Sequence, residues 1–187
     1  MNEEIIMAGF GGQGVMSMGK ILAYAGMKED KEVSWIPSYG PEMRGGTANC
    51  TVIISDQKIP SPMSSQPDSI IVMNYPSLEK FISQIKPGGK VFVNSSLVKE
   101  ETLAENREQN DVEIIEIPAG DIASELGNNK VANMVILGAF ITKKELVGLY
   151  TVKKALKWVL PERRHDIIPL NEKALERGKN LIKSTIS

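Results

Sequence analysis

The first forty residues change hydrophobic period around a cluster of glycines. Residues 4–9 form a short apolar run, which is typical of a buried strand. Apolar residues then recur at helical spacing and share one helix face; they are Val15, Met18, Ile21, Leu22 and Ala25. A polar connection and a second short strand over residues 33–37 follow. The pattern therefore predicts strand, glycine-rich turn, helix and strand, which is a βαβ unit.

Further apolar runs with strand character cover residues 48–56, 68–74, 90–96 and 112–117. The second of these is apolar almost throughout, as in a strand covered on both faces. A short helix is expected over residues 77–85, where a proline and two glycines end it.

The last third of the chain is predicted to be helical. Residues 119–126 form a short helix, and residues 131–144 are apolar nearly all round, so that helix should be largely buried. Two amphipathic helices follow, over residues 151–160 and 169–184.

These elements predict a Rossmann-like α/β fold: a mainly parallel sheet flanked by helices, with a helical C-terminal segment. We find no linker, and expect one domain over residues 1–187. Within it, residues 1–150 form the α/β core and residues 151–187 the C-terminal helices.

Composition excludes several classes of site. The net charge is −1, so nothing in the composition favours a nucleic-acid or membrane-surface partner. One cysteine, Cys50, and one histidine, His165, are too few for an internal disulfide, a zinc site or an iron–sulfur cluster. If the protein takes part in redox chemistry, the metal must lie elsewhere.

The N-terminal residues predict a cytoplasmic protein. Acidic residues stand where a signal peptide needs a basic region, and the apolar run is short. No window approaches the 18 uninterrupted apolar residues of a membrane helix.

The glycine cluster, residues 9–14, reads GFGGQG and fits the pattern G-x-G-x-x-G between a strand and a helix. Its backbone amides suit an anion, and they belong to Gly11, Gly12, Gln13 and Gly14. A dinucleotide site also needs an acid about 20 residues further on, at the end of the second strand.

That ribose-binding acid is missing from its place. Asp30 and Glu32 precede the second strand, and Glu42 follows a proline in a loop. The missing acid argues against an NAD-binding site. A stand-alone Rossmann-like nucleotide-binding protein that uses Gly9–Gly14 stays open as an alternative, and so does plain strand–helix packing.

A second unusual segment, residues 38–47, reads SYGPEMRGGT and cannot be regular structure. In a doubly wound sheet it should open at the same carboxyl edge as the glycine cluster. Arg44 suits a phosphate or a carboxylate, and an ion pair with Glu42 is the plainer alternative. Interface candidates here are Tyr39, Glu42, Arg44, Gly45 and Gly46.

Other polar residues are weaker candidates. Asn133 and Ser95–Ser96 can line the same edge, although capping explains them as well. We expect His165 to be solvated and Cys50 to be a buried small residue. No set of nucleophile, base and orienting residue can be assembled, so no catalytic residue is predicted.

Taken together, GFGGQGVMSMGKILAYAGM and VSWIPSYGPEMRGGTANCTVIIS resemble the γ subunit of 2-oxoacid:ferredoxin oxidoreductases, most closely the 2-oxoglutarate type. PDSIIVMNYPSLEKF, KPGGKVFVNSSLV and ELGNNKVANMVILGA extend the likeness in order, over about residues 4–140. Pyruvate, branched-chain and indolepyruvate relatives share the fold and the first motif.

The resemblance implies a component of a larger enzyme that is inactive by itself. Such an enzyme oxidatively decarboxylates a 2-oxoacid to its acyl-CoA and reduces ferredoxin. It implies α, β and δ partner subunits in a heterotetramer. These would supply thiamine diphosphate, Mg²⁺ and [4Fe–4S] clusters, and CoA would reach this chain only through the assembled complex.

The two motifs carry over residue by residue, and their matching positions are Gly9, Gly11–Gly14, Ser38–Glu42 and Arg44–Gly46. We expect this edge to pack on the catalytic subunits near the channel for CoA and substrate. There Arg44 and the amides of Gly11–Gly14 would meet a CoA phosphate or a partner carboxylate.

Overall fold

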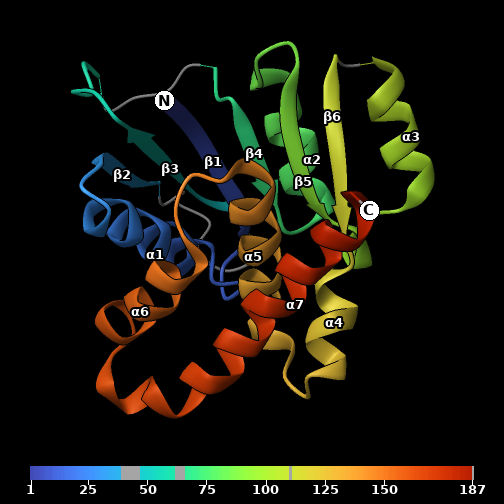
Figure 1. Cartoon of the computed structure of the whole chain (residues 1–187). Helices are drawn as coiled ribbons and strands as arrows, with labels where there is room; N and C mark the ends of the chain where they lie inside the picture. The colour runs from blue at the N-terminus through green and yellow to red at the C-terminus, as the bar shows by residue number, and fades with distance from the viewer. Residues whose placement is uncertain (39–46, 62–65, 110, 187) are drawn as a thin grey trace.

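The computed structural model describes residues 1–38, 47–61, 66–109 and 111–186. The described strands form a 6-stranded sheet in the order β2-β3-β1-β4-β5-β6, with helices on both of its faces (Figure 1). The strands are β1 (Asn2–Phe10), β2 (Glu32–Ser38), β3 (Thr47–Ser55), β4 (Ser69–Val72), β5 (Gly89–Asn94) and β6 (Val112–Ile117).

The longer helices are α1 (Val15–Lys28), α3 (Glu100–Gln109), α5 (Ala132–Lys144), α6 (Leu149–Val159) and α7 (Ile168–Ile186). Two short helices are α2 (Tyr75–Phe81) and α4 (Ala119–Glu125). The 3-10 helices are η1 (Ile82–Gln84), η2 (Ser95–Leu97), η3 (Asn129–Val131) and η4 (Glu162–Ile167).

Most of the sheet is parallel, as the sequence predicts. Strands β1, β4, β5 and β6 run in one direction, and β3 pairs antiparallel with both β1 and β2. Neighbouring residues of β1 face opposite sides of the sheet, and both kinds are buried because helices cover both faces. The larger core includes Ile5 and Met7 under α1 and α4–α7, and the smaller includes Ile6 and Ala8 under α2 and α3.

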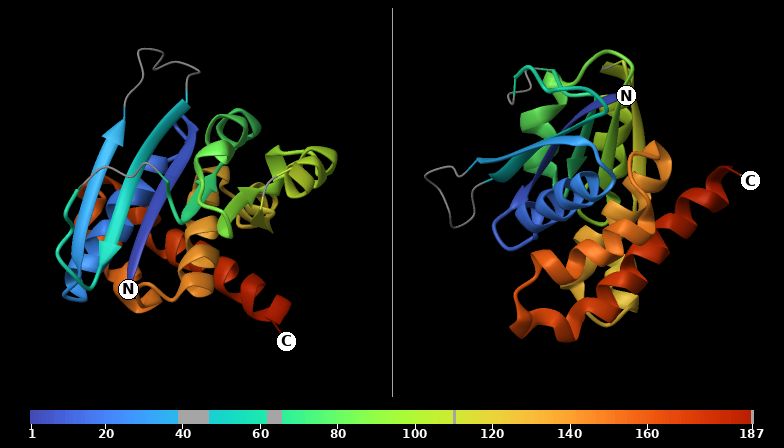
Figure 2. Two further views of the ribbon diagram at one scale, coloured as in Figure 1. Left: turned by 90° about the horizontal axis from the view of Figure 1, so that it is seen from above. Right: turned by 60° about the vertical axis from the view of Figure 1, so that its left-hand side comes forward.

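Helix α5 is the centre of the larger core. Each residue from Ala132 to Ile141 is buried, which confirms the prediction from its apolar sequence. Helix α7 crosses α5 closely, at Gly138 and Gly178. The two layers of helices are visible from the side in Figure 2.

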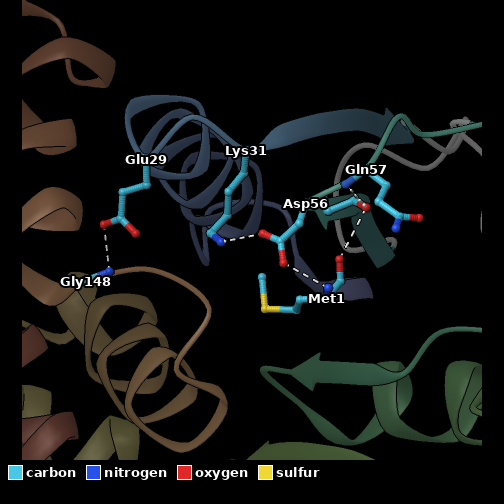
Figure 3. A network of polar contacts seen from close by, with 7 residues as sticks. Met1, Glu29, Lys31, Asp56, Gln57 and Gly148 are labelled. Carbon is cyan, nitrogen blue, oxygen red and sulfur yellow. Dashed lines mark hydrogen bonds and ion pairs between the residues drawn. The ribbon is translucent and has the colours of Figure 1, made fainter.

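Ion pairs link the ends of several helices and strands. The Met1 ammonium and Lys31 each lie 2.9 Å from the Asp56 carboxylate, and they lower the pKa of that carboxyl to about 2 (Figure 3). At the end of α5, Lys144 lies 2.9 Å from the buried Glu3 of β1, whose carboxylate also accepts a hydrogen bond from Ser69.

The structure differs from the sequence prediction in two places. The predicted strand–helix–strand unit forms, but β3 lies between β1 and β2, so these two strands are not neighbours. Helix α3 was not predicted, because its sequence is polar and Leu103 is its one fully buried apolar residue among those whose side chains are described.

Candidate functional site

Six chain segments meet at the carboxyl edge of the sheet. The parallel strands β1, β4, β5 and β6 all end there, and β2 ends at Ser38 on the same side. Thr47, which begins β3, pairs with Phe10 at the end of β1. The start of β3 therefore lies beside the glycine cluster, and the end of β2 lies one strand further away. The candidates among residues 39–46 lie outside the described residues: Tyr39, Glu42, Arg44, Gly45 and Gly46.

The glycine cluster forms a tight turn from β1 into α1. Gln13 N donates to the carbonyl of Phe10 at 3.1 Å, and Phe10 N donates to Gln13 Oε1 at 2.7 Å. Gly12 and Gly14 have φ values of 95° and 75°, which side chains disfavour. A Cβ on Gly9 would lie 2.8 Å from Gln13 Oε1, so glycine at position 9 gives the Gln13 side chain room to fold back.

Side-chain amides from later elements hold this turn in place. Asn74, just after β4, donates to Gln13 Oε1 at 2.7 Å while its own Oδ1 caps α2. Asn133 in the first turn of α5 donates to the carbonyl of Gly14 at 3.2 Å. Asn94, at the end of β5, donates to the carbonyl of Met73 and accepts from Gly120 N at 3.2 Å. These hydrogen bonds fix the loops in place and so preorganise the edge, and they occupy most of the hydrogen-bonding groups of the three asparagine side chains.

Two hollows lie on either side of the turn. The first, about 390 Å³, is lined by Gly12, Gln13, Asn94, Ser96 and Asp121, among others. The second, about 510 Å³, is lined by Gly12, Gly14 and Ser17 and by the basic residues Arg163 and Arg164. Lys130 of η3 lines both hollows.

The charges favour an anion at the second hollow and are balanced at the first. In the first, Asp121 accepts a hydrogen bond from Ser96 at 2.9 Å. In the second, Arg163 and Arg164 outnumber Asp166, and the start of α1 has no side-chain cap. A helix start of this kind and three basic side chains suit a phosphate or carboxylate. The backbone amides and basic side chains of this edge can therefore bind and orient an anion.

The structure also bears on the missing ribose acid. Asp30 precedes β2 and Glu32 begins it, so both lie at the far end of a seven-residue strand, about 20 Å from the carboxyl edge. Because β3 intervenes, the end of β2 is also about 10 Å from β1, twice the usual spacing. A dinucleotide laid across the glycine turn would not find its usual ribose contact among the described residues.

The single cysteine and histidine lie away from such chemistry. Cys50 is fully buried, as predicted, and burial raises the pKa of its thiol to about 12. His165 is not fully solvated, contrary to expectation: it is half-buried, and its Nε2 lies 2.9 Å from the carbonyl of Leu160. The His165 side chain reaches the end of α6 because the chain turns into η4 directly after that helix.

The sequence predicted some of the residues at the carboxyl edge but not others. Gly11, Gly12, Gln13 and Gly14 lie where predicted, but their binding role remains a prediction. Asn133 and Ser96 do line the hollows. The missed residues are Asn74, Asn94, Asp121, Lys130, Arg163 and Arg164. A polar residue directly after an apolar strand was the available signal for Asn74 and Asn94.

A mainly parallel sheet between helices, with a glycine turn into the first helix, defines a Rossmann-like α/β protein. Its described edge suits an anion but lacks the ribose contact of a dinucleotide site. The chain belongs to the pyruvate ferredoxin/flavodoxin oxidoreductase family, whose sequence pattern matches residues 4–181.

Three known proteins illustrate the likeness. Ketoisovalerate oxidoreductase subunit VorA of Methanothermobacter marburgensis is 36% identical over 177 residues, which are 94% of this chain and 35% of VorA. The chain thus spans about a third of the length of the first curated relatives it matches. The γ subunit of a keto/oxoacid ferredoxin oxidoreductase from Geobacter sulfurreducens has a TM-score of 0.78 at 28% identity, covering 97% of this chain and 99% of that one.

The third is 2-oxoglutarate:ferredoxin oxidoreductase from Magnetococcus marinus, with 2-oxoglutarate, coenzyme A and succinyl-CoA bound. It has a TM-score of 0.84 at 25% identity and covers 98% of this chain and 31% of that one.

None of the helices in the described part of the chain has the length and apolar character that a membrane crossing needs.

Proposed function

We propose that the chain is the γ part of a thiamine-diphosphate-dependent 2-oxoacid:ferredoxin oxidoreductase. The complex would convert a 2-oxoacid to its acyl-CoA with reduction of ferredoxin, in the cytoplasm. The observation that carries this proposal is the family match over residues 4–181, and the anion-binding groups of the carboxyl edge support it.

The redox and thiamine chemistry would belong to partner α, β and δ subunits. A [4Fe–4S] cluster does not fit this chain, because such clusters need several thiolates and the sequence has one cysteine. Cys50 is buried, and the raised pKa keeps its thiol protonated near neutral pH. The described residues also contain no group of three His, Cys, Asp or Glu side chains that would hold the Mg²⁺ of thiamine diphosphate.

CoA is the one group of the reaction that the carboxyl edge would fit. Its phosphates would accept hydrogen bonds from the backbone amides of Gly11–Gly14 and a bidentate pair from the Arg44 guanidinium. Lys130, Arg163 and Arg164 line the adjoining hollows and add positive charge. The chain would thereby help to bind and position CoA at an edge that packs on the catalytic subunits.

We favour 2-oxoglutarate as the substrate, because the two loop motifs resemble those of that type. Ketoisovalerate is the competing substrate, since the name of VorA refers to it. The pocket that binds the 2-oxoacid would lie in another subunit, so this preference rests on the resemblance and on no substrate contact in this chain.

Reconstitution tests the proposal. The subunits encoded beside this chain should reduce ferredoxin with a 2-oxoacid and CoA only when the chain is present. The rates with 2-oxoglutarate, ketoisovalerate and pyruvate then rank the substrates. Full activity without the chain, or no association with those subunits, would contradict the proposal.

The second candidate is a stand-alone nucleotide-binding protein that uses the Gly9–Gly14 turn. The glycine pattern and the start of α1 favour it, and the position of β2 opposes it. Calorimetry with the isolated chain distinguishes the two, because micromolar affinity for NAD or S-adenosylmethionine would support the second candidate.

A further inference from the structure

A basic and aromatic surface lies on the outer side of α1 and α6, apart from the carboxyl edge. We call it the α6 patch and define it by Tyr24, Met27, Tyr150, Lys154, Lys157 and Trp158. Trp158 and Tyr150 are 69% and 68% exposed, and Met27 is 61% exposed. Large apolar side chains exposed together on a protein surface are typical of an interaction site.

The patch forms because α6 is amphipathic and packs along α1. Its inner face is buried through Val152, Ala155 and Leu156. Tyr150, Lys154, Lys157 and Trp158 recur at intervals of three and four residues, so they share the opposite face. Glu29, at the end of α1, accepts a hydrogen bond from Gly148 N at 2.8 Å and fixes the start of α6 there (Figure 3). The two helices accordingly lie side by side (Figure 1).

Contacts between rings and lysines hold the patch in shape. The rings of Trp158 and Tyr24 stack with centroids 6.3 Å apart. Lys28 Nζ lies 5.4 Å from the centre of the Tyr24 ring, and Lys154 Nζ lies 4.4 Å from the centre of the Tyr150 ring. Such contacts keep the aromatic side chains oriented for a partner while they stay exposed.

A hollow of about 520 Å³ lies between the outer face of α6 and the start of α7. Tyr150, Trp158 and Ile168 supply its apolar lining, and lysines surround it. Its size is enough for one or two apolar side chains of a partner.

The charge of the patch indicates what would cover it. Lys153 is neutralised by Glu176 at 2.7 Å. Lys154 and Lys157 have no carboxylate at ion-pair distance among the described residues, and Glu172 is the one acid that lines the hollow. A second copy of the chain is a poor occupant, since a symmetric contact would bring lysines against lysines.

We propose that the α6 patch docks a partner subunit through a surface that places Asp or Glu side chains around an apolar side chain, with the apolar group in the hollow between α6 and α7. This inference rests on the proposed function, because it takes the partner from the same oxidoreductase. Tyr24 is ten residues after Gly14, about 15 Å along α1, so this contact is separate from the carboxyl edge.

Binding of the full chain to the complex assembled without it tests the proposal, by biolayer interferometry at two salt concentrations. Trp158→Ala should raise Kd about tenfold or more. Lys154→Glu with Lys157→Glu should raise Kd at least as much and flatten its dependence on salt. All three substituted residues are exposed, and circular dichroism checks the fold.

Matched controls on another part of the surface are Lys58→Glu and Lys80→Glu, made together, whose side chains are also exposed. They should leave Kd within about twofold. Docking through the α6 patch is wrong if the patch variants bind like these controls. It is also wrong if they change only self-association in sedimentation velocity. If the unchanged chain does not bind the other subunits, the proposed function fails as well.

Discussion

Gly12 and Gly14 share a backbone requirement but differ in their surroundings. Both have positive φ. A Cβ on Gly12 would meet no atom within 4 Å, whereas a Cβ on Gly14 would lie 2.4 Å from Asn133 Nδ2. The strain of a left-handed residue is therefore the whole cost at Gly12, and a steric clash adds to it at Gly14.

We predict that Gly12→Ala lowers the free energy of unfolding by about 1 kcal/mol and Gly14→Ala by about 2–4 kcal/mol. Urea unfolding of the purified chain measures both. Asn133→Ala in the Gly14→Ala background should recover part of the loss, because it removes the clashing amide. Equal losses at the two glycines would show that the contact with Asn133 does not matter.

Arg44 is the residue on which the CoA proposal depends most. It follows β2 and precedes β3, and the end of β2 and the start of β3 both lie at the carboxyl edge. In the reconstituted complex, we predict that Arg44→Ala raises the apparent KM for CoA about tenfold or weakens assembly, because a charge-assisted contact is lost. Lys58→Ala is the control, because Lys58 is exposed and follows β3 at the opposite edge of the sheet. Unchanged CoA kinetics together with unchanged assembly would exclude a role for Arg44.

At the scale of the element, α5 and α7 approach until backbone meets backbone. A Cβ on Gly138 would lie 2.1 Å from the carbonyl oxygen of Leu175, and one on Gly178 would lie 1.9 Å from that of Val135. A backbone carbonyl cannot rotate away as a side chain can, so any larger residue has to push the helices apart.

We predict that Gly178→Ala lowers the free energy of unfolding by about 3 kcal/mol or more, although alanine favours a helix by about 1 kcal/mol. Asn180→Ala, an exposed position on the same helix, should change it by less than about 0.5 kcal/mol. Thermal unfolding of both variants makes the comparison. A neutral Gly178→Ala would mean that the two helices pack less tightly than described.

The elements of the core were predictable because their hydrophobic period is strong. The residues from Val112 to Ile117 form a strand with the predicted bounds, and α5 is buried all round as its sequence implies. Helix α3 could not be predicted in this way, since it has almost no apolar stripe and folds mainly against the edge strand β6.

At the scale of the whole molecule, the position of β3 affects the site most. By pairing between β1 and β2, it moves the end of β2 away from the glycine turn and leaves the turn without its usual neighbour strand. Nothing local in the sequence of β3 encodes that choice, because the alternation of its residues is the same in either position. The order shows only in the tertiary structure, where β3 pairs with β1 along one side and with β2 along the other.

The sequence by itself determined the α/β class, the glycine turn, the burial of α5 and the shortage of cysteines, because each depends on local spacing or on counting. Only the tertiary structure decided that Asn74, Asn94 and Asn133 fasten one edge and that Lys130 lies between two hollows. The pairing of Trp158 with Tyr24 on an exposed surface was likewise hidden from the sequence. These residues are far apart along the chain, and only the pairing of strands and the packing of helices bring them into contact.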